Sequence, residues 1–590
     1  MTDRGRLSRF AGLIPALVAG ALSAAVSWRT WINPFVDSSR EMNVPARIAV
    51  GERLYRDVVY HYGPAGPWIN ALAIQLFGRR FAGLEMTGLL AAAVLLYSLF
   101  RLTERAGSSL SACAAVTWAA AICMGASNGG SFLFPYSFGA LFALAGCFLS
   151  LAVCAAPLSR GGLCLGSAGL ALALAAKPEI GAAAALVLLV AGLRGRLSWD
   201  QRKRLFAVIL YGALAAAALY TIAFAGIPWN DLSPEGPFAL FSPPEPWRNV
   251  YRIMSGLADP GESLRSAATS LFLDLLIIAG AVAASRLATR IPGSAEVVWI
   301  LTVAAAAAFL GFGPGRLLDD RLPPLLSPMP LVSAVAALTM LRSRLDGAGL
   351  ARWMLFGFSA AVSARVLLGL RYGAISTPYS ILVFPGLAAT AAVLTLDVLA
   401  EKLPTRRMTR RFLAAVFIAL SAVALARWQR YHAHGRERLV TSAGALRLRS
   451  DRAAAVAETL GFLASHARPG DTLSGFPETG GFFNFVTGLR NPLREEQVLP
   501  GHLDAAGEER LIRHIEKDGP RFILIANRPT PEFGAPGFGR DYAVGVWNEI
   551  RQHYRLSASF GPAPPETAVG SPAFFIRVYE RGNPETSRTP

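Results

Sequence analysis

The sequence predicts a polytopic α-helical membrane protein that carries a soluble α/β domain at its C-terminal end. Of its 590 residues, 53% are hydrophobic and only 16% are charged, whereas soluble domains carry about 25% charged residues. Long apolar segments recur up to residue 427, and after that point the composition turns polar. We therefore expect a membrane region, 1–427, followed by a soluble region, 428–590.

Thirteen apolar segments approach the length of about 20 residues that a helix needs to cross a bilayer. They lie at approximately 11–28, 82–100, 110–126, 131–154, 162–176, 179–194, 205–226, 268–286, 296–312, 325–341, 353–370, 379–400 and 411–427. The pair 162–176 and 179–194 is short enough to form a hairpin that does not cross fully. No small-residue cleavage pattern follows the first segment, so we expect it to be retained as a helix.

The charge of the connecting loops alternates along the membrane region and predicts its orientation. Short basic loops, such as RGRLSWDQRKR and EKLPTRRMTRR, alternate with acidic and aromatic loops, such as 29–81 and 227–267. Lys and Arg sort to the cytoplasmic side, which accounts for the net charge of +18 without a nucleic-acid partner. We expect a protein of the bacterial inner (cytoplasmic) membrane with a cytoplasmic N-terminus, and the odd number of spans then places 428–590 outside the cytoplasm.

The C-terminal region has the pattern of a small α/β domain. The segment AGALRLRSDRAAAVAETLGFLASHA predicts a helix, while DTLSGF, RFILIAN, YRLSASF and AFFIRVYERG predict short strands between Gly/Pro turns. Glu478 lies in FPETGGFFNFVTGLRNP, where we favour a strand-to-helix turn with an aromatic cluster over a role in acceptor binding. All five cysteines lie in or beside apolar segments, so neither a disulfide framework nor metal-ligand spacing is present.

The first predicted extracytoplasmic loop, 29–81, is rich in ionisable residues. Eight charged residues and one histidine lie between Phe35 and Gly66, although ionisable groups at membrane depth are costly unless they have a function. Asp37 and Glu41 share one face of a helix if the chain stays helical past the first span, with Arg40 adjacent. We expect helices over PARIAVGERLYRDVVYH and WINALAIQLFG, separated at GPAGP, that present these carboxylates to a central cavity. The alternative is a solvated, salt-bridged loop.

The pattern Asp-x-x-x-Glu followed by LYRDVVYHYGP resembles the first extracytoplasmic loop of bacterial family-39-type and Rgt-like glycosyltransferases of the GT-C superfamily. That superfamily includes protein mannosyltransferases and the aminoarabinose transferases of lipid A. The resemblance extends to the layout of thirteen spans, the outer C-terminal domain and the segment AAKPEIG. It implies a sugar donor on a polyprenyl phosphate, an envelope glycan, lipid or protein as acceptor, and an acidic first-loop residue as catalytic base. Asp37 matches by position, but many relatives carry adjacent acids where this chain has DSSRE, so the base is either Asp37 or Glu41.

The chemistry of such a transfer identifies further candidate residues. A carboxylate must deprotonate the acceptor hydroxyl, and cations must hold the phosphate leaving group. Lys177 is the most prominent cation, because it lies with Glu179 between two apolar runs; the alternative is a snorkelling lysine in a turn. The other candidates for substrate binding are Arg40, Arg56, Asp57, His61, Tyr62, Arg371 and Tyr372.

Cofactor motifs are sparse in the sequence. Asp319 and Asp320, in GPGRLLDDRLPP, have the oxygen ligands that Mg²⁺ or Mn²⁺ would require, but we favour a solvated turn for this pair. Neither a Walker loop nor a GxGxxG motif in a strand–helix context is present, so no nucleotide site is expected.

The alternatives to a glycosyltransferase are a transporter or flippase and a polymerase or ligase of lipid-linked glycans. A transporter or flippase of lipid-linked glycans should show paired halves with related broken helices, and the sequence has no such internal symmetry. A glycan polymerase or ligase would use a pyrophosphate donor and carry a large late outer loop rather than an early acidic one. The glycosyltransferase is therefore favoured.

The loop charges predict the topology, which reporter fusions can test. Fusions at Arg204 and Arg407 should report a cytoplasmic location because both residues lie in basic loops. A fusion after Pro590 should report an extracytoplasmic location. A cytoplasmic signal after Pro590 would contradict the odd number of spans.

Overall fold

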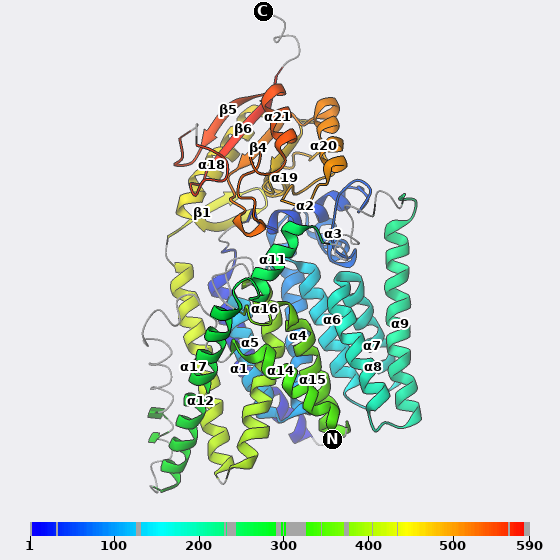
Figure 1. Ribbon diagram of the computed structural model, residues 1–590, viewed down its shortest axis with the longest axis vertical. Helices are drawn as coiled ribbons and strands as arrows, with labels where there is room; N and C mark the ends of the chain where they lie inside the picture. Colours follow the sequence, from blue (N-terminus) through cyan, green and yellow to red (C-terminus); the bar gives the residue numbers. More distant parts are fainter. Residues whose placement is uncertain are drawn as a thin grey trace, which may run out of the picture.

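The computed structural model describes residues 3–30, 34–125, 131–228, 232, 243–290, 297–298, 300–301, 326–343, 345–370, 377–403, 405–433, 435–564 and 567–582. A bundle of helices forms most of the elongated molecule, and a mixed α/β region covers one end of the bundle (Figure 1). The N-terminus lies at the opposite end (Figure 1). The predicted fold class, a helical membrane region with a C-terminal α/β region, is confirmed.

Helices occupy the predicted spans with one exception. Their bounds are α1 Asp3–Ser27, α4 Phe81–Ala106, α5 Ser109–Gly125, α6 Phe138–Cys154, α7 Arg160–Ala176, α8 Pro178–Arg194, α9 Trp199–Phe224, α12 Pro260–Arg290, α14 Met329–Arg342, α15 Gly347–Ser363, α16 Thr377–Val393 and α17 Arg406–Ala433. The exception, 296–312, lies almost entirely outside the described residues. The prediction of a helix from 131 is wrong, because α6 begins only at Phe138, where the Ser137 hydroxyl accepts the Ala140 N–H as an N-cap.

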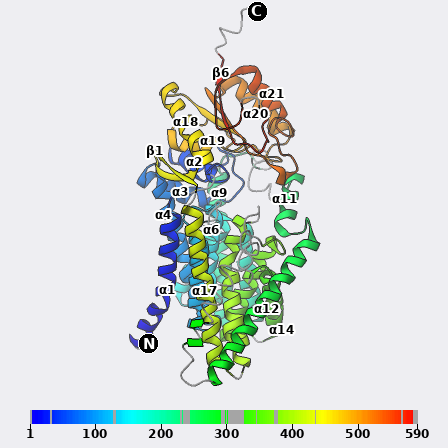
Figure 2. The same ribbon diagram turned by 90° about the vertical axis from the view of Figure 1, so that its left-hand side faces the viewer.

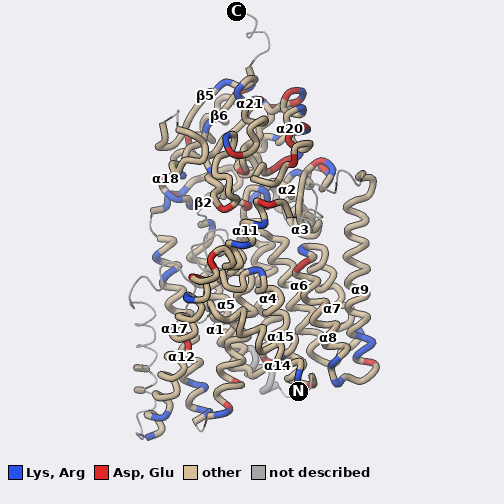
Figure 3. The backbone as a smooth tube through the Cα atoms, in the orientation of Figure 1, with Lys and Arg blue, Asp and Glu red and all other residues tan. Residues whose placement is uncertain are grey.

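Five helical stretches are long and apolar enough, by length and composition, to cross a membrane. They are Phe81–Ala106, Trp199–Phe224, Glu245–Arg290, Tyr379–Lys402 and Arg406–Ala433. Helix α16 reaches this length because a π-helical turn, Leu394–Leu399, and a 3₁₀ turn, Ala400–Lys402, continue it. Most of the bundle carries uncharged residues, and charged side chains gather at its two ends and over the C-terminal region (Figure 3). This distribution is what an integral multi-pass membrane protein requires.

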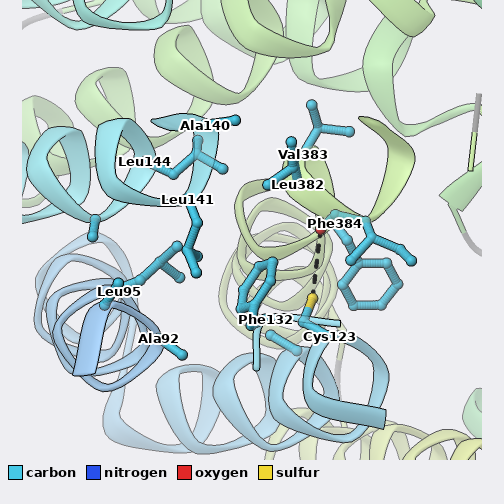
Figure 4. Close-up of a cluster of buried hydrophobic side chains, with 14 of the residues drawn as sticks. Ala92, Leu95, Cys123, Phe132, Ala140, Leu141, Leu144, Leu382, Val383 and Phe384 are labelled. Atoms are coloured by element: carbon cyan, nitrogen blue, oxygen red, sulfur yellow. Dashed lines mark hydrogen bonds between the residues drawn. The ribbon is translucent and has the colours of Figure 1, made fainter. Parts of the chain in front are cut away.

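The interior of the bundle is packed by aromatic and small side chains. Phe132, Leu141 and Phe384 lie in one buried cluster beside α4 and α5, where the Cys123 thiol donates a hydrogen bond to the carbonyl of Ile381 (Figure 4). Elsewhere, α6 and α7 approach so closely that a Cβ on Gly146 would clash with the α7 backbone at the carbonyl oxygen of Gly169. Such contacts between small residues are a main source of attraction between helices in a membrane.

The first loop forms two helices, α2 (Ser38–Ala49) and α3 (Ala65–Phe77). The predicted helix from Pro45 to His61 is wrong in both bounds, since α2 begins seven residues earlier and ends at Ala49. Gly51 has a φ of 101° and therefore ends the helix with a backbone conformation that other residues rarely adopt. The following residues, as far as Pro64, form turns and an isolated bridge. The second helix of the loop is confirmed and starts at Ala65.

The C-terminal region contains a hairpin and a four-stranded mixed sheet. The hairpin pairs β1 (Arg436–Thr441) with β2 (Gly444–Arg449), and the sheet has the order β3-β4-β6-β5. The sheet strands are β3 Leu473–Phe476, β4 Phe522–Ala526, β5 Tyr554–Phe560 and β6 Ile576–Arg581, and the helices are α18 Ser450–His466, α19 Gly480–Thr487, α20 Ala505–Asp518 and α21 Val544–His553. The four predicted strands are all present. The helix predicted over AGALRLRSDRAAAVAETLGFLASHA, however, starts only at Ser450, because the residues before it form strand β2 of the hairpin.

The α/β region docks on the first loop through α2 and α19, which lie side by side in both views (Figures 1 and 2). Ser39 donates a hydrogen bond of 2.5 Å to the carbonyl of Glu478. Arg47 pairs with Glu496 at 2.7 Å and with Glu52 at 2.6 Å. Because these ionic groups are buried, they hold the helix in one position only as long as every partner is present.

Removal of the Arg47 guanidinium should therefore loosen the docked region. In Arg47→Met, Glu496 loses its ion pair while it stays buried, and the loss of one partner of a buried pair costs about 3–5 kcal/mol. We expect a clearly lower thermal unfolding midpoint, measured by intrinsic fluorescence of the purified protein.

Arg56→Met is the matched control, because Arg56 belongs to the same loop and its pair with Asp57 is exposed. Exposed pairs contribute little to stability. Equal midpoints for the two variants would contradict the docking role of Arg47.

Candidate active site

Asp37 lies between α1 and α2, at the N-cap position of α2. Its backbone has φ 54° and ψ −46°, and its carbonyl accepts the N–H of Glu41 at 3.1 Å. The side chain keeps 31% of its surface exposed, and its carboxylate lies 3.2 Å from Arg40. A positive φ is uncommon for a residue other than glycine and is found disproportionately at functional sites. Asp37 is thus a partly open carboxylate held in an unusual backbone conformation.

Glu41 has a different environment. Its carboxylate accepts the backbone N–H of Phe138 at 2.9 Å and pairs with Arg40 at 3.2 Å. The side chain is only 3% exposed. Burial raises the pKa of Glu41, although Arg40 and the Phe138 N–H oppose this effect. Glu41 therefore connects α2 to the first turn of α6, where backbone N–H groups lack helical partners.

Lys177 lies in the turn between α7 and α8 and is almost completely buried. Its Nζ is 4.5 Å from the centre of the Tyr62 ring and 5.8 Å from that of Tyr136. Arg40 approaches Tyr62 as well, at 5.0 Å. Cations over aromatic faces retain their charge with less solvation. Tyr62 therefore contacts both Lys177 and Arg40, and Arg40 in turn pairs with Asp37.

Arg365 extends this cationic cluster from another part of the chain. It lies in a 3₁₀ turn, Ala364–Val366, that follows α15. Its guanidinium is 4.5 Å from the ring centre of Tyr251 and 4.9 Å from that of Tyr379. Glu179 lies 3.9 Å from both Arg365 and Lys177. Two cations thus lie near a single carboxylate, and neither ion pair is close. The net charge of the group is positive, which suits the binding of an anion.

The C-terminal region contributes a chain of polar contacts to Asp37 and its neighbours. Arg40 donates a hydrogen bond of 2.8 Å to Gln497, and Gln497 donates one of 3.0 Å to Glu478. Glu478 also forms an ion pair with Arg528. Burial raises the pKa of Glu478, while Arg528 lowers it. Glu478 occupies the turn between β3 and α19, as expected, but it also reaches the first loop.

The structure brings some predicted residues together and separates others. Asp37, Arg40, Tyr62 and Lys177 form one connected group, whereas Arg56 is exposed and pairs only locally with Asp57. Asp57 accepts the backbone N–H of Arg53 at 2.7 Å and so shapes its own turn.

His61 is buried in a separate ring cluster. Its ring centre lies 5.3 Å from that of Trp247 and 4.9 Å from that of His502. Burial lowers the pKa of His502 well below its ordinary value, which fits packing rather than proton exchange at neutral pH. His61 therefore lies at the contact between the first loop and the C-terminal region.

Four predicted residues lie outside the described part of the chain, namely Arg371, Tyr372, Asp319 and Asp320. Within the described part, no group of three or more His, Cys, Asp or Glu side chains could hold a metal ion. Both interpretations of the aspartate pair, a solvated turn and a site for Mg²⁺ or Mn²⁺, stay untested.

The sequence did not lead us to Arg365 and Gln497 as members of this site, and for Glu478 we favoured a turn over a functional role. The sequence does contain an indication for Arg365, because it is a charged residue near the outer end of the apolar segment 353–370. Charged residues in such segments are often functional. The contact of Arg40 with Gln497 joins residues 457 positions apart, and no local pattern indicates it.

Comparisons with known proteins give no family for this chain. No family model matches it, and no curated protein matches it. Among solved structures, the oligosaccharyltransferase of Archaeoglobus fulgidus, in complex with Zn and sulfate, aligns with a TM-score of 0.46 and 13% identity over 87% of this chain and 67% of that chain. ArnT from Cupriavidus metallidurans in the apo state aligns with a TM-score of 0.42 and 15% identity over 98% of both chains. The same protein bound to undecaprenyl phosphate aligns with a TM-score of 0.35. At these scores and identities we draw no residue equivalence from them.

Proposed function

We propose that the chain is a GT-C-type membrane glycosyltransferase that moves a sugar from a polyprenyl-phosphate donor to an envelope glycan, lipid or protein acceptor. The reaction takes place on the extracytoplasmic face of the bacterial inner membrane, under the α/β region. The observation that supports this function is the partly exposed carboxylate of Asp37 beside a buried cluster of cations and tyrosines. A base next to an anion site, at the end of a membrane bundle, is the arrangement that a lipid-phosphate donor requires.

In the proposed reaction, the acceptor hydroxyl attacks the anomeric carbon while the bond from that carbon to the phosphate oxygen breaks. Asp37 takes the hydroxyl proton, and the phosphate leaves with the bonding electrons as polyprenyl phosphate. Lys177 and Arg365 are the groups that would stabilise the charge developing on the phosphate, because Lys177 is buried and Arg365 is only 29% exposed. Attack opposite the leaving group inverts the anomeric configuration.

Asp37 is the better of the two candidate bases. The Glu41 carboxylate is buried and held by Arg40 and the Phe138 N–H, so it has little freedom to meet an acceptor. The Asp37 side chain is 31% exposed and has one ion pair among the described residues. A general base must come within hydrogen-bond reach of the proton it removes, and only Asp37 has the exposed surface for this.

Asp37→Asn should abolish transfer while the protein stays folded. The substitution is nearly isosteric and removes the basic oxygen, so we expect a loss on the order of a hundredfold or more. Mass analysis of envelope glycans can measure this, in a strain that lacks the chain and is complemented with each variant at equal membrane abundance.

Glu41→Gln is the matched comparison, and it should reduce transfer less. Loss of transfer in Glu41→Gln with full activity in Asp37→Asn would make Glu41 the base. Full activity in both variants would contradict the catalytic role of the first loop.

Lys177→Met should weaken the use of the donor without removing the protein from the membrane. A hydrogen bond to a charged group contributes about 1.5–3 kcal/mol, so the apparent KM for the polyprenyl-phosphate sugar should rise about tenfold or more. Transfer assays in membrane vesicles at limiting donor can measure this change. Arg365→Met should act in the same direction.

Lys203→Met serves as the control, because Lys203 is an exposed lysine on α9 that also lies near an aromatic ring, at 5.1 Å from Trp199. Wild-type turnover of Lys177→Met at limiting donor would indicate that Lys177 is a structural lysine.

A further inference from the structure

A cavity of about 260 Å³ lies between the first loop and the C-terminal region. Its lining includes Phe35 and Val36 from the first loop and Arg452, Glu478, Arg528 and Phe574 from the C-terminal region. It is separate from the cluster of Lys177 and Arg365, and the function proposed above assigns nothing to it.

The cavity adjoins the proposed catalytic base. Val36 directly precedes Asp37 in the chain, and Glu478 accepts the Ser39 hydroxyl through its carbonyl oxygen. The ion pair of Glu478 with Arg528 forms part of the wall. A molecule in this cavity would therefore lie beside the first turn of α2, where the Asp37 carboxylate emerges.

The two arginines of the cavity differ in whether an acidic side chain pairs with them. Arg528 pairs with Glu478 and also with Glu532, at 3.0 Å. Arg452 forms no ion pair among the described residues, since the adjacent Asp451 pairs with Arg449 at 3.0 Å instead. The buried Nε of Arg452 likewise makes no hydrogen bond in the described part of the chain.

The position of the Arg452 guanidinium is fixed by a stack of rings. It lies 5.1 Å from the centre of the Phe574 ring. Phe574 in turn stacks on Phe35, with ring centres 6.0 Å apart and planes 14° apart. Burial lowers the pKa of Arg452, although the adjacent Asp451 opposes this effect. The lowering reflects the free-energy cost of partly desolvating a cation that has no ion pair in the described part of the chain. An anionic ligand would offset this cost, and the planar guanidinium can bind a carboxylate or a phosphate with two hydrogen bonds.

We propose that this cavity binds an anionic sugar unit of the acceptor, whose carboxylate or phosphate pairs with Arg452 and whose hydroxyl groups face the polar lining residues Glu478 and Asn527. The volume lies below the range of about 300–1,000 Å³ that drug-sized ligands occupy, and so it suits a single small polar unit. The inference rests on the proposed function only in naming the ligand as part of the acceptor. Anion and sugar binding at Arg452 can be tested without any transfer.

The test is direct binding to the purified full-length chain in nanodiscs, without donor. The probes are glucuronate, glucose 6-phosphate, glucose and inorganic phosphate, and saturation-transfer NMR measures their dissociation constants. We expect glucuronate or glucose 6-phosphate to bind at least about tenfold more tightly than glucose, and Arg452→Gln to remove this difference. Whichever of the two anionic sugars binds better identifies the acceptor group as a carboxylate or a phosphate.

Arg513→Gln is the control, because Arg513 is an exposed arginine of α20 that pairs with Glu509 and is not part of the cavity lining; this variant should bind the probes as the wild type does. Arg452→Lys keeps the charge and should retain weaker binding, so it replaces Arg452→Gln if that variant does not fold. Equal binding of glucose and the anionic sugars, or unchanged binding in the Arg452 variants, would overturn the proposal. Tight binding of inorganic phosphate alone would also overturn it, because the cavity would then be an anion site without sugar recognition.

The outcomes separate this proposal from the proposed function. Binding that depends on Arg452, together with an active Asp37→Asn variant, would leave an anionic sugar site but contradict the catalytic role of Asp37. Loss of transfer in Asp37→Asn without binding of these probes would support the transferase and reject this acceptor site.

Discussion

The insertion of α2 between the membrane bundle and the α/β region is the constraint on which the rest of the site depends. This helix is short and strongly polar, yet nearly all of its side chains are buried. Its arginines have partners on both sides of the interface: Arg40 pairs with Glu41 and donates a hydrogen bond to Gln497, and Arg47 pairs with Glu496. Buried charges tolerate little displacement, because a lost partner leaves a desolvated ion. The position of Asp37 at the start of α2 is fixed by these pairs.

The same helix separates two kinds of chemistry. On the bundle side, Lys177 and Arg365 form a positive site among tyrosine rings, where the proposed function places the phosphate of the donor. On the other side, Arg452 and Arg528 line a cavity that faces the α/β region. Under the proposed function, a carboxylate between these two sites serves a donor that arrives from the bilayer and an acceptor that arrives from the aqueous side.

Hydropathy and loop charge predicted the spans, the α/β region and the polar first loop, because these depend on composition and local periodicity. They did not predict the bounds of α2, since the end of that helix depends on one left-handed glycine, Gly51. They also could not rank Asp37 above Glu41. That distinction arises from the Phe138 N–H, which reaches Glu41 from a helix 97 positions further along the chain. Arg365 and Lys177 both lie near Glu179 because the bundle packs two turns together that are distant in the sequence, and no local pattern indicates this contact.

The docking of α2 also has a consequence for biogenesis. The first loop is synthesised early, whereas the C-terminal residues that contact it are made much later, with Gln497 457 positions after Arg40. Until they are made, Arg40 lacks Gln497 and Arg47 lacks Glu496, and the α/β region does not yet cover α2. Chains that stop before these residues therefore hold an incomplete candidate site, and the site takes its full geometry only after the α/β region has been synthesised and has folded. Assembly of the site is in this way coupled to the folding of the α/β region.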